Sequence, residues 1–306
     1  MHEINQQMRP SDIIILVILS ILWGGSFFFV EVLVDYLKPL TIVTMRVGIA
    51  AIALWIILAV LKAPLPKERR HWAALLVVGI LNNALPFSLI VWGQTHISSG
   101  LASILNATTP FFTVLVAGVF LLDEKITRGK LIGVLVGLAG TVILIGPDAL
   151  RGLNASILGQ LAVMGAGLSY AFATVFSRRF KSWGIAPIVI ATGQVTMASL
   201  VLLPLTLIID KPYLDFSLPA PALGAIIGLS IFSTVIAYTL FFRLVSSAGA
   251  TNTALVTFLI PISAILMGVT ILGESFNAAQ ALGMSVIGLG LLIIDGRLFK
   301  KRFPPK

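Results

Sequence analysis

Long apolar stretches, separated by short polar segments, follow one another along almost the whole chain. A helix of ~20 residues, rising 1.5 Å per residue, crosses the ~30 Å hydrocarbon core of a bilayer, so each stretch predicts a membrane-spanning helix. The pattern therefore predicts an all-α integral membrane protein with ten spans. We expect them at residues 13–34, 39–61, 72–92, 98–122, 127–146, 156–177, 185–209, 219–242, 249–272 and 277–298.

The polar and glycine positions of the first half return in the second. Residues 98–110 and 124–140 recur as 246–261 and 274–290. The chain is therefore expected to contain two five-helix repeats, at 13–146 and 156–298. Because five is an odd number of crossings, the second repeat must enter the membrane upside down relative to the first, as in inverted-repeat carriers.

Composition supports a membrane protein and removes several alternatives. Of the 306 residues, 58% are hydrophobic and 11% are charged, which is more apolar than a soluble domain of this size requires. The polar start Met1–Asp12 runs into an apolar stretch too long for a signal peptide. With no cysteine, the chain has no disulfide and no thiolate metal site.

The net charge of +9 is unevenly distributed over the loops. If the loops alternate between two sides, 17 of the 21 basic residues fall on the side of the N-terminus, whereas only Lys38, Arg151 and Lys211 fall on the other. This is the positive-inside pattern. It predicts a multi-pass protein of the cytoplasmic (inner) membrane with both termini in the cytoplasm, and it explains the basic charge without a nucleic-acid partner.

Two repeat-related aromatic residues lie far from the interfaces where such rings usually sit. Trp23 is about ten residues into its span, near the bilayer midplane, and Tyr170 is its equivalent in the second repeat. Two interpretations are open. The rings are packed or lipid-facing bulk, or they form a stacking wall for a substrate.

Three prolines interrupt predicted helices and mark candidate hinges, Pro86, Pro110 and Pro261. Proline lacks an N–H group, so the carbonyl four residues earlier loses its helical partner. Those positions are Asn82, Asn106 and Thr257. A polar residue beside a free carbonyl at this depth should face protein or a wet cavity, so we expect these three residues and Thr108 to line a substrate site. The alternative is that the prolines are only packing kinks.

An arginine lies inside a span. Arg46 and its repeat equivalent Gln194 are each about seven residues, or ~10 Å, into their helices. A buried arginine usually has a partner in the bundle interior, and Glu31 lies at a compatible depth. We expect a Glu31–Arg46 pair that acts as an outer gate or holds a substrate carboxylate, and we count Gln194 as a binding candidate. A structural ion pair, or snorkelling of Arg46 to the headgroups, is the alternative.

The motifs at these positions resemble one family. Leu-Trp-Gly-Gly-Ser at 22–26, Pro-Leu-Thr at 39–41 leading to Arg46, and Pro110 followed by Asp-Glu at 123–124 and a glycine-rich helix are similar to the EamA-type branch of the drug/metabolite transporter superfamily. The second half repeats the set with Pro261 and Gly-Glu at 273–274. The resemblance implies a carrier, often an exporter of amino acids or other small metabolites, with a central cavity between two five-helix halves.

Three classes of function were compared. The favoured one is a secondary transporter exporting an amino acid or an aromatic, drug-like compound by alternating access; a carrier of phosphorylated or nucleotide-sugar metabolites would need more cations. A channel would need a filter or a charged ring, and a lipid-modifying enzyme would need a nucleophile, base or metal cluster. The sequence suggests none of these, and no metal, cofactor or ATP site. Glycine seams at 129–140 and 283–290 join the two halves or form a homodimer.

Overall fold

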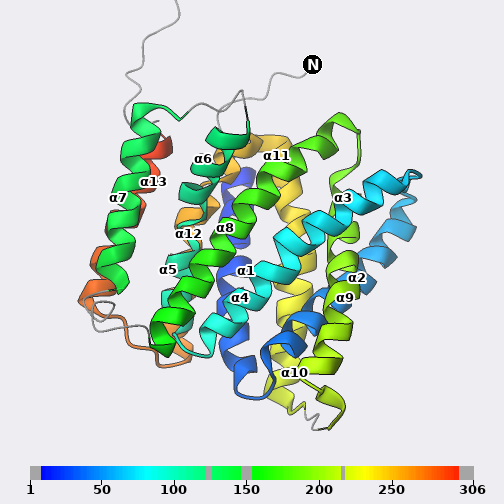
Figure 1. Cartoon of the computed structure of the whole chain (residues 1–306), viewed down its shortest axis with the longest axis horizontal. Helices are drawn as coiled ribbons and strands as arrows, with labels where there is room; N and C mark the ends of the chain where they lie inside the picture. Colours follow the sequence, from blue (N-terminus) through cyan, green and yellow to red (C-terminus); the bar gives the residue numbers. More distant parts are fainter. Residues whose placement is uncertain (1–7, 122–125, 146–153, 215–217, 296–306) are drawn as a thin grey trace, which may run out of the picture.

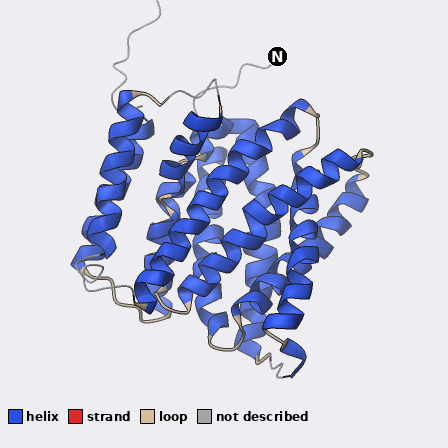
Figure 2. Cartoon of the chain, in the orientation of Figure 1, coloured by secondary structure: helices blue, strands red, loops and turns tan. Residues whose placement is uncertain are grey.

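The computed structural model describes residues 8–121, 126–145, 154–214 and 218–295, and helices account for all the regular structure in these ranges (Figures 1 and 2). The first repeat contains α1 (Pro10–Val34), α2 (Pro39–Leu61), α3 (Arg69–Gly79), η1 (Ile80–Ala84), α4 (Leu85–Gln94), α5 (Ser99–Asn106), α6 (Thr109–Phe120) and α7 (Arg128–Ile145). The second contains α8 (Ala155–Ser182), α9 (Pro187–Ile209), η3 (Pro212–Leu214), α10 (Ala220–Ile227), η4 (Gly228–Ile236), α11 (Ala237–Thr253), α12 (Val256–Ile271) and α13 (Ala278–Asp295).

The all-α membrane fold expected from the sequence is confirmed. Within the described ranges, nine helices are long and apolar enough to cross a bilayer, and α12 is a shorter apolar helix. The chain turns at Gly249, whose φ of 81° lies in the left-handed region where glycine carries no steric penalty. Residues 250–253 therefore begin a separate helix that α12 continues, which supplies the tenth span.

Contacts between the last helices of the two repeats show how the halves are related. A Cβ added to Gly133 of α7 would lie 2.7 Å from the carbonyl oxygen of Gly290 in α13, and one added to Gly140 would lie 3.0 Å from that of Gly283. Residue number rises along one helix as it falls along the other, so α7 and α13 are antiparallel neighbours (Figure 1). The contacts are reciprocal between equivalent positions, as an inverted two-fold relation requires. This glycine seam joins the two halves.

The second helices of the repeats pair in the same way. The hydroxyl groups of Thr44 in α2 and Thr206 in α9 are 2.6 Å apart, and Trp55 Nε1 donates to Thr196 Oγ1 at 3.0 Å. The helices again run antiparallel. Because each repeat packs its second and fifth helices against those of the other, the core is shared between the repeats.

Irregular helix geometry occurs at equivalent places in both repeats. The third span of each contains a π-helical segment, η1 in the first and η4 in the second. The fourth is broken in the first repeat between α5 and α6, at Ala107 and Thr108, and in the second before α12, at Ala254 and Leu255. Such departures from α-helix in a membrane span are tolerated only where protein or a wet cavity receives the freed polar groups.

The carbonyl groups released near two prolines are satisfied within the protein. The carbonyl of Asn106 accepts from Thr109 Oγ1 at 2.7 Å. In the π-helical register the missing bond of Pro86 belongs to Leu81, whose carbonyl accepts from Ser169 Oγ of α8 at 2.7 Å. Pro110 follows the break as the second residue of α6, whereas Pro261 lies inside α12, six residues past the corresponding break. The hinge roles of the three prolines stay predictions.

Candidate functional site

The side chain of Arg46 marks the centre of the candidate site. It is 6% exposed, and α2 carries it toward the third span of the second repeat. Its Nε donates to Thr234 Oγ1 of η4 at 3.1 Å, and its guanidinium carbon lies 3.7 Å from the ring centre of Phe87 in α4. Both contacts are neutral, so a cation is held in the membrane interior by a hydroxyl group and an aromatic face.

The expected pair between Glu31 and Arg46 is wrong. In the described part of the chain the one ion pair within 4 Å joins Arg70 and Glu68. Glu31 instead accepts from Gln94 Nε2 of α4 at 3.0 Å. The two residues lie at similar depths along their helices, which suggested the pair, but their side chains face different neighbours. A sequence indicates the depth of a residue in the membrane more readily than the direction of its side chain around the helix axis. Among the described residues, the buried guanidinium therefore has no carboxylate within ion-pair distance.

The π-helical segment η1 supplies two neighbouring amides to the same region. Asn82 Nδ2 donates to Gln194 Oε1 of α9 at 3.1 Å, and Asn83 Nδ2 donates to the hydroxyl of Tyr238 in α11 at 2.9 Å. A regular α-helix turns consecutive residues 100° apart, and the wider π turn changes which side chains reach the interior. The predicted residues Asn82 and Gln194 are thus brought together across the two repeats.

Aromatic side chains lie beside this polar group. The hydroxyl of Tyr238 accepts from Asn83, and the Tyr238 side chain packs against the core around α2, α9 and η4. Tyr170 packs against both of the large hydrophobic cores, the one around α1, α5 and α12 and the one around α2, α9 and η4. Trp23 packs against the first core, with its ring centre 5.4 Å from that of Phe241. The predicted repeat pair Trp23 and Tyr170 is therefore partly buried against the core, and its role in stacking substrate stays a prediction.

Several oxygen atoms in the π-helical segments have no hydrogen-bond partner. They are buried, and they belong to Asn83 (Oδ1), Ser230 (Oγ) and Ser233 (Oγ). A buried polar atom without a partner costs about 1–3 kcal/mol, so such atoms commonly mark places that a water or a ligand satisfies. Together with Arg46 they give the region one fixed positive charge and several free acceptors.

Three predicted residues lie at or next to the helix breaks of the fourth spans. Thr108 turns its hydroxyl onto the carbonyl of Leu105, 2.6 Å away. Asn106 ends α5 with its Oδ1 buried and unpartnered, and Thr257 lies in the first turn of α12. Across the described ranges, no hydrogen bond links any of the three to Arg46 or to the π-helical amides. Their role in binding substrate stays a prediction.

Sequence reasoning missed four residues that contact Arg46 or its neighbours, Phe87, Asn83, Thr234 and Tyr238. A signal existed for Asn83, which follows a predicted residue and precedes Pro86 by one helical turn. Thr234 and Tyr238 have no polar equivalent in the first repeat, so a search for repeat-related polar positions passes over them. Among the described residues, no cluster of three or more His, Cys, Asp or Glu side chains is placed to hold a metal ion.

The sequence of the chain is similar to those of known transporters. The sequence matches the model of the EamA-like transporter family over residues 11–146 and 157–295. A protein of Archaeoglobus fulgidus named an uncharacterized transporter is 26% identical over 284 residues, covering 92% of this chain and 97% of its own. The uncharacterized inner membrane transporter YedA of Escherichia coli K12 is 28% identical over 295 residues, covering 94% and 91%.

The fold is also similar to that of a solved crystal structure. It superposes with a TM-score of 0.68 at 18% sequence identity and covers 97% of this chain and all of its own. At this level of identity the likeness concerns the fold alone.

Proposed function

Because the chain belongs to the EamA-like transporter family, we propose that this multi-pass membrane transporter exports a small metabolite with a single carboxylate, an amino acid or an aromatic compound of similar size. Arg46 would bind the carboxylate. The chain would work as a secondary carrier in the cytoplasmic membrane with both termini in the cytoplasm, since 17 of 21 basic residues fall on that side.

The observation that carries the proposal is the state of Arg46. The guanidinium is buried at membrane depth, and within the described residues its polar and aromatic partners are a hydroxyl group and a phenyl ring at the distances given above. A desolvated cation of this kind is costly until an anion pairs with it. One fixed charge matches one carboxylate in a bidentate pair, whereas a phosphate ester or a nucleotide sugar would leave negative charge uncompensated.

The surrounding groups support an amino acid or an aromatic ligand. The unpartnered Asn83 Oδ1 is an acceptor available to an ammonium group. Tyr170 and Tyr238 pack beside the cores, and their rings would stack against an ammonium group or an aromatic side chain. The neutral polar groups would fix the orientation of the ligand, and the aromatic rings would accommodate ligands with a range of side chains.

Alternating access would follow from the helix breaks. The fourth span of each repeat is broken in its first half, at Ala107–Thr108 and at Ala254–Leu255. If each break bends independently of the other, one end of the bundle opens while the other closes, as inverted-repeat carriers do. The breaks therefore support a carrier over a fixed channel.

The proposal is tested with the purified protein in thermal-shift and proteoliposome assays. Amino acids and aromatic carboxylates are compared with their amides, which keep the shape and lose the charge. Carboxylates are expected to raise the melting temperature and to show saturable flux, and the amides are expected to do neither. Arg46→Gln should abolish the difference, whereas Arg70→Gln, which changes an exposed cation paired with Glu68, should leave it intact.

Two outcomes would overturn the proposal. One is equal transport of acids and amides, and the other is full carboxylate transport by Arg46→Gln. Export is checked separately, by comparing uptake into inverted membrane vesicles with uptake into intact cells. Reporter fusions at both chain ends test the proposed topology.

A further inference from the structure

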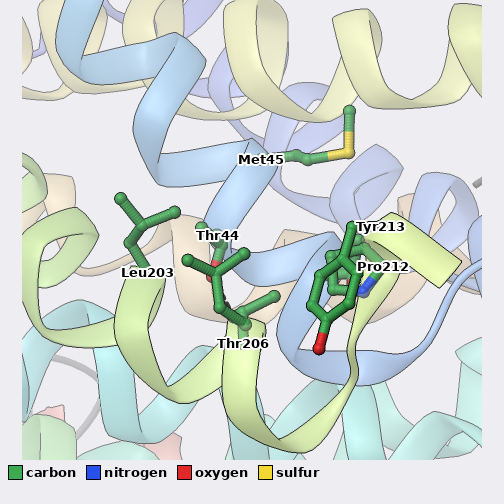
Figure 3. A pocket seen from close by; sticks show the side chains of 8 residues that line it. Thr44, Met45, Leu203, Thr206, Pro212 and Tyr213 are labelled. Carbon is green, nitrogen blue, oxygen red and sulfur yellow. Dashed lines mark hydrogen bonds between the residues drawn. The ribbon is translucent and has the colours of Figure 1, made fainter.

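A groove lies between α2 and α9, and none of its lining residues belongs to the group around Arg46. Its volume is about 410 Å³, within the ~300–1,000 Å³ range of small-molecule sites. Figure 3 shows Met45 and Thr44 on α2, Leu203 and Thr206 on α9, and the ring of Tyr213 beside Pro212 at one end. The lining residues are Thr41, Thr44, Met45, Leu203, Thr206, Leu207, Pro212 and Tyr213.

The surroundings of this groove are the bilayer. Both α2 and α9 are membrane spans, and Leu203 and Leu207 are 49% and 44% exposed. The hydroxyl groups of Thr44 and Thr206 bond to each other, and Thr206 also donates to the carbonyl of Leu40. The polar groups on the walls are thus satisfied internally, which leaves an apolar slot. An unfilled slot in the hydrocarbon would forfeit dispersion contacts, so a hydrocarbon chain should fill it.

The mouth of the groove carries positive charge. Lys211 immediately precedes the lining residue Pro212 and is exposed, and Lys38 Nζ donates to the carbonyl of Asp210 at 3.0 Å. These are two of the three basic residues that the loops place on this side of the membrane. The Asp210 carboxylate is already used, because its Oδ2 accepts from the backbone N–H and the hydroxyl of Thr41 at 2.7 and 2.9 Å.

The third element at the mouth is Tyr213. It is 65% exposed and lies in η3, four residues after α9 ends, at the level where tyrosine commonly meets lipid headgroups. A phenol hydroxyl at that depth donates to phosphate or ester oxygens. Two lysines and a tyrosine therefore surround the open end of an apolar slot, which is the arrangement expected of a headgroup site joined to a chain site.

We propose that this groove binds one anionic phospholipid from the leaflet at that end of the bundle. One acyl chain would lie in the slot between α2 and α9, and the phosphate would meet Lys38, Lys211 and the Tyr213 hydroxyl. The lipid would bridge a helix of each repeat. Because α2 also carries Arg46, one residue after the groove residue Met45, the bound lipid would steady the helix that holds the candidate substrate anchor.

The site is tested on the full-length protein in nanodiscs of phosphatidylcholine alone or of phosphatidylcholine with phosphatidylglycerol. Phosphatidylglycerol is expected to raise the melting temperature by several degrees, because it binds the folded state. Lys211→Gln should remove most of that gain. The matched control is Lys62→Gln, which changes another exposed lysine with positive φ after a helix, at the other end of α2.

A second pair of variants tests the slot independently of charge. Leu203→Trp places a larger ring in the groove, and Leu200→Trp adds the same ring to an exposed position of α9 that does not line it. We expect Leu203→Trp to show no gain in melting temperature from phosphatidylglycerol and no retention of this lipid in native mass spectrometry. Leu200→Trp should show both the gain and the retention.

The inference fails if the wild type melts at the same temperature in both lipid mixtures. It also fails if the gain persists in both Lys211→Gln and Leu203→Trp, which would indicate diffuse surface charge rather than this groove. Retention of phosphatidylcholine equal to that of phosphatidylglycerol would contradict headgroup recognition.

Discussion

The carboxylate of Glu274 accepts a hydrogen bond from the backbone N–H of Ser99 at 2.8 Å. Its second oxygen accepts from the N–H of Gly100 at 3.1 Å. Glu274 belongs to the second repeat and Ser99 begins α5 of the first, so one side chain of one repeat caps a helix of the other. Its repeat equivalent Glu124 lies outside the described residues.

The first prediction concerns this contact. Glu274→Ala should destabilise the protein by about 1–3 kcal/mol, because two N–H groups at a helix start lose a charged acceptor. Glu274→Gln should cost less, since one acceptor oxygen remains. Unfolding is followed by thermal denaturation in detergent. Glu68→Gln, an exposed carboxylate paired only with Arg70, is the control and should have little effect. Equal melting temperatures for all three variants would contradict the capping role.

The second prediction tests whether Glu31 and Arg46 act as a pair. Because Glu31 bonds to Gln94 and Arg46 to Thr234, exchanging the two charges should rescue nothing. The double variant Glu31→Arg/Arg46→Glu is expected to transport no better than the worse single variant. The coupling free energy in Glu31→Gln/Arg46→Gln should be within about 0.5 kcal/mol of zero. Recovery of transport in the double variant would contradict this prediction and indicate a direct pair between Glu31 and Arg46.

The third prediction concerns the hydroxyl group that holds Arg46. Thr234→Val removes the acceptor of the Arg46 Nε, a bond to a charged group that is worth ~1.5–3 kcal/mol. We expect the apparent affinity for substrate to fall about tenfold, since each 1.4 kcal/mol is a factor of ten. Thr239→Val, an exposed threonine that bonds only to the carbonyl of Val235, should leave affinity unchanged. Initial-rate measurements in proteoliposomes separate the two.

The fourth prediction addresses the glycine seam. Gly133→Ala and Gly290→Ala should each destabilise the protein by about 1–3 kcal/mol, because the new methyl group meets the carbonyl of the opposite helix at 2.7 and 2.6 Å. Gly288→Ala on the same helix meets nothing within 4 Å. It should be neutral or gain up to ~1 kcal/mol from helix propensity. Opposite signs in thermal unfolding are therefore expected, and a stabilising Gly290→Ala would contradict the packing.

The fifth prediction separates a binding role from a structural one at Asn106. The buried Oδ1 of this side chain has no partner in the structure, while its carbonyl is satisfied by Thr109. Asn106→Ala should therefore leave stability unchanged or raise it, because a desolvated acceptor is removed. Transport should fall if the substrate donates a hydrogen bond to this oxygen. Unchanged transport would assign the residue to the helix break alone.

Particular residues show how far the sequence predicted the candidate site. Arg46 was identified because a charged residue is rare inside an apolar span and its depth can be counted from the start of the helix. Asn82 and Gln194 were identified separately, one through a proline and the other through the repeat, and the structure joins them by a hydrogen bond. Thr234 and Tyr238 were missed, since a threonine or tyrosine in a span is common and only the π-helical turns bring these two to Arg46 and Asn83.

The sequence alone determined the spans, their number and their inverted repetition. Span length follows from bilayer thickness, and each residue contributes locally to hydropathy, so these features need no knowledge of neighbours. Only the tertiary structure decided which way each polar side chain faces: Glu31 toward Gln94, Glu274 toward Ser99, and Arg46 toward Thr234. The direction of a side chain around the helix axis is set by packing between helices, and the π-helical turns change it further. The depth of each polar residue in the membrane could therefore be predicted from the sequence, whereas its hydrogen-bond partner could not.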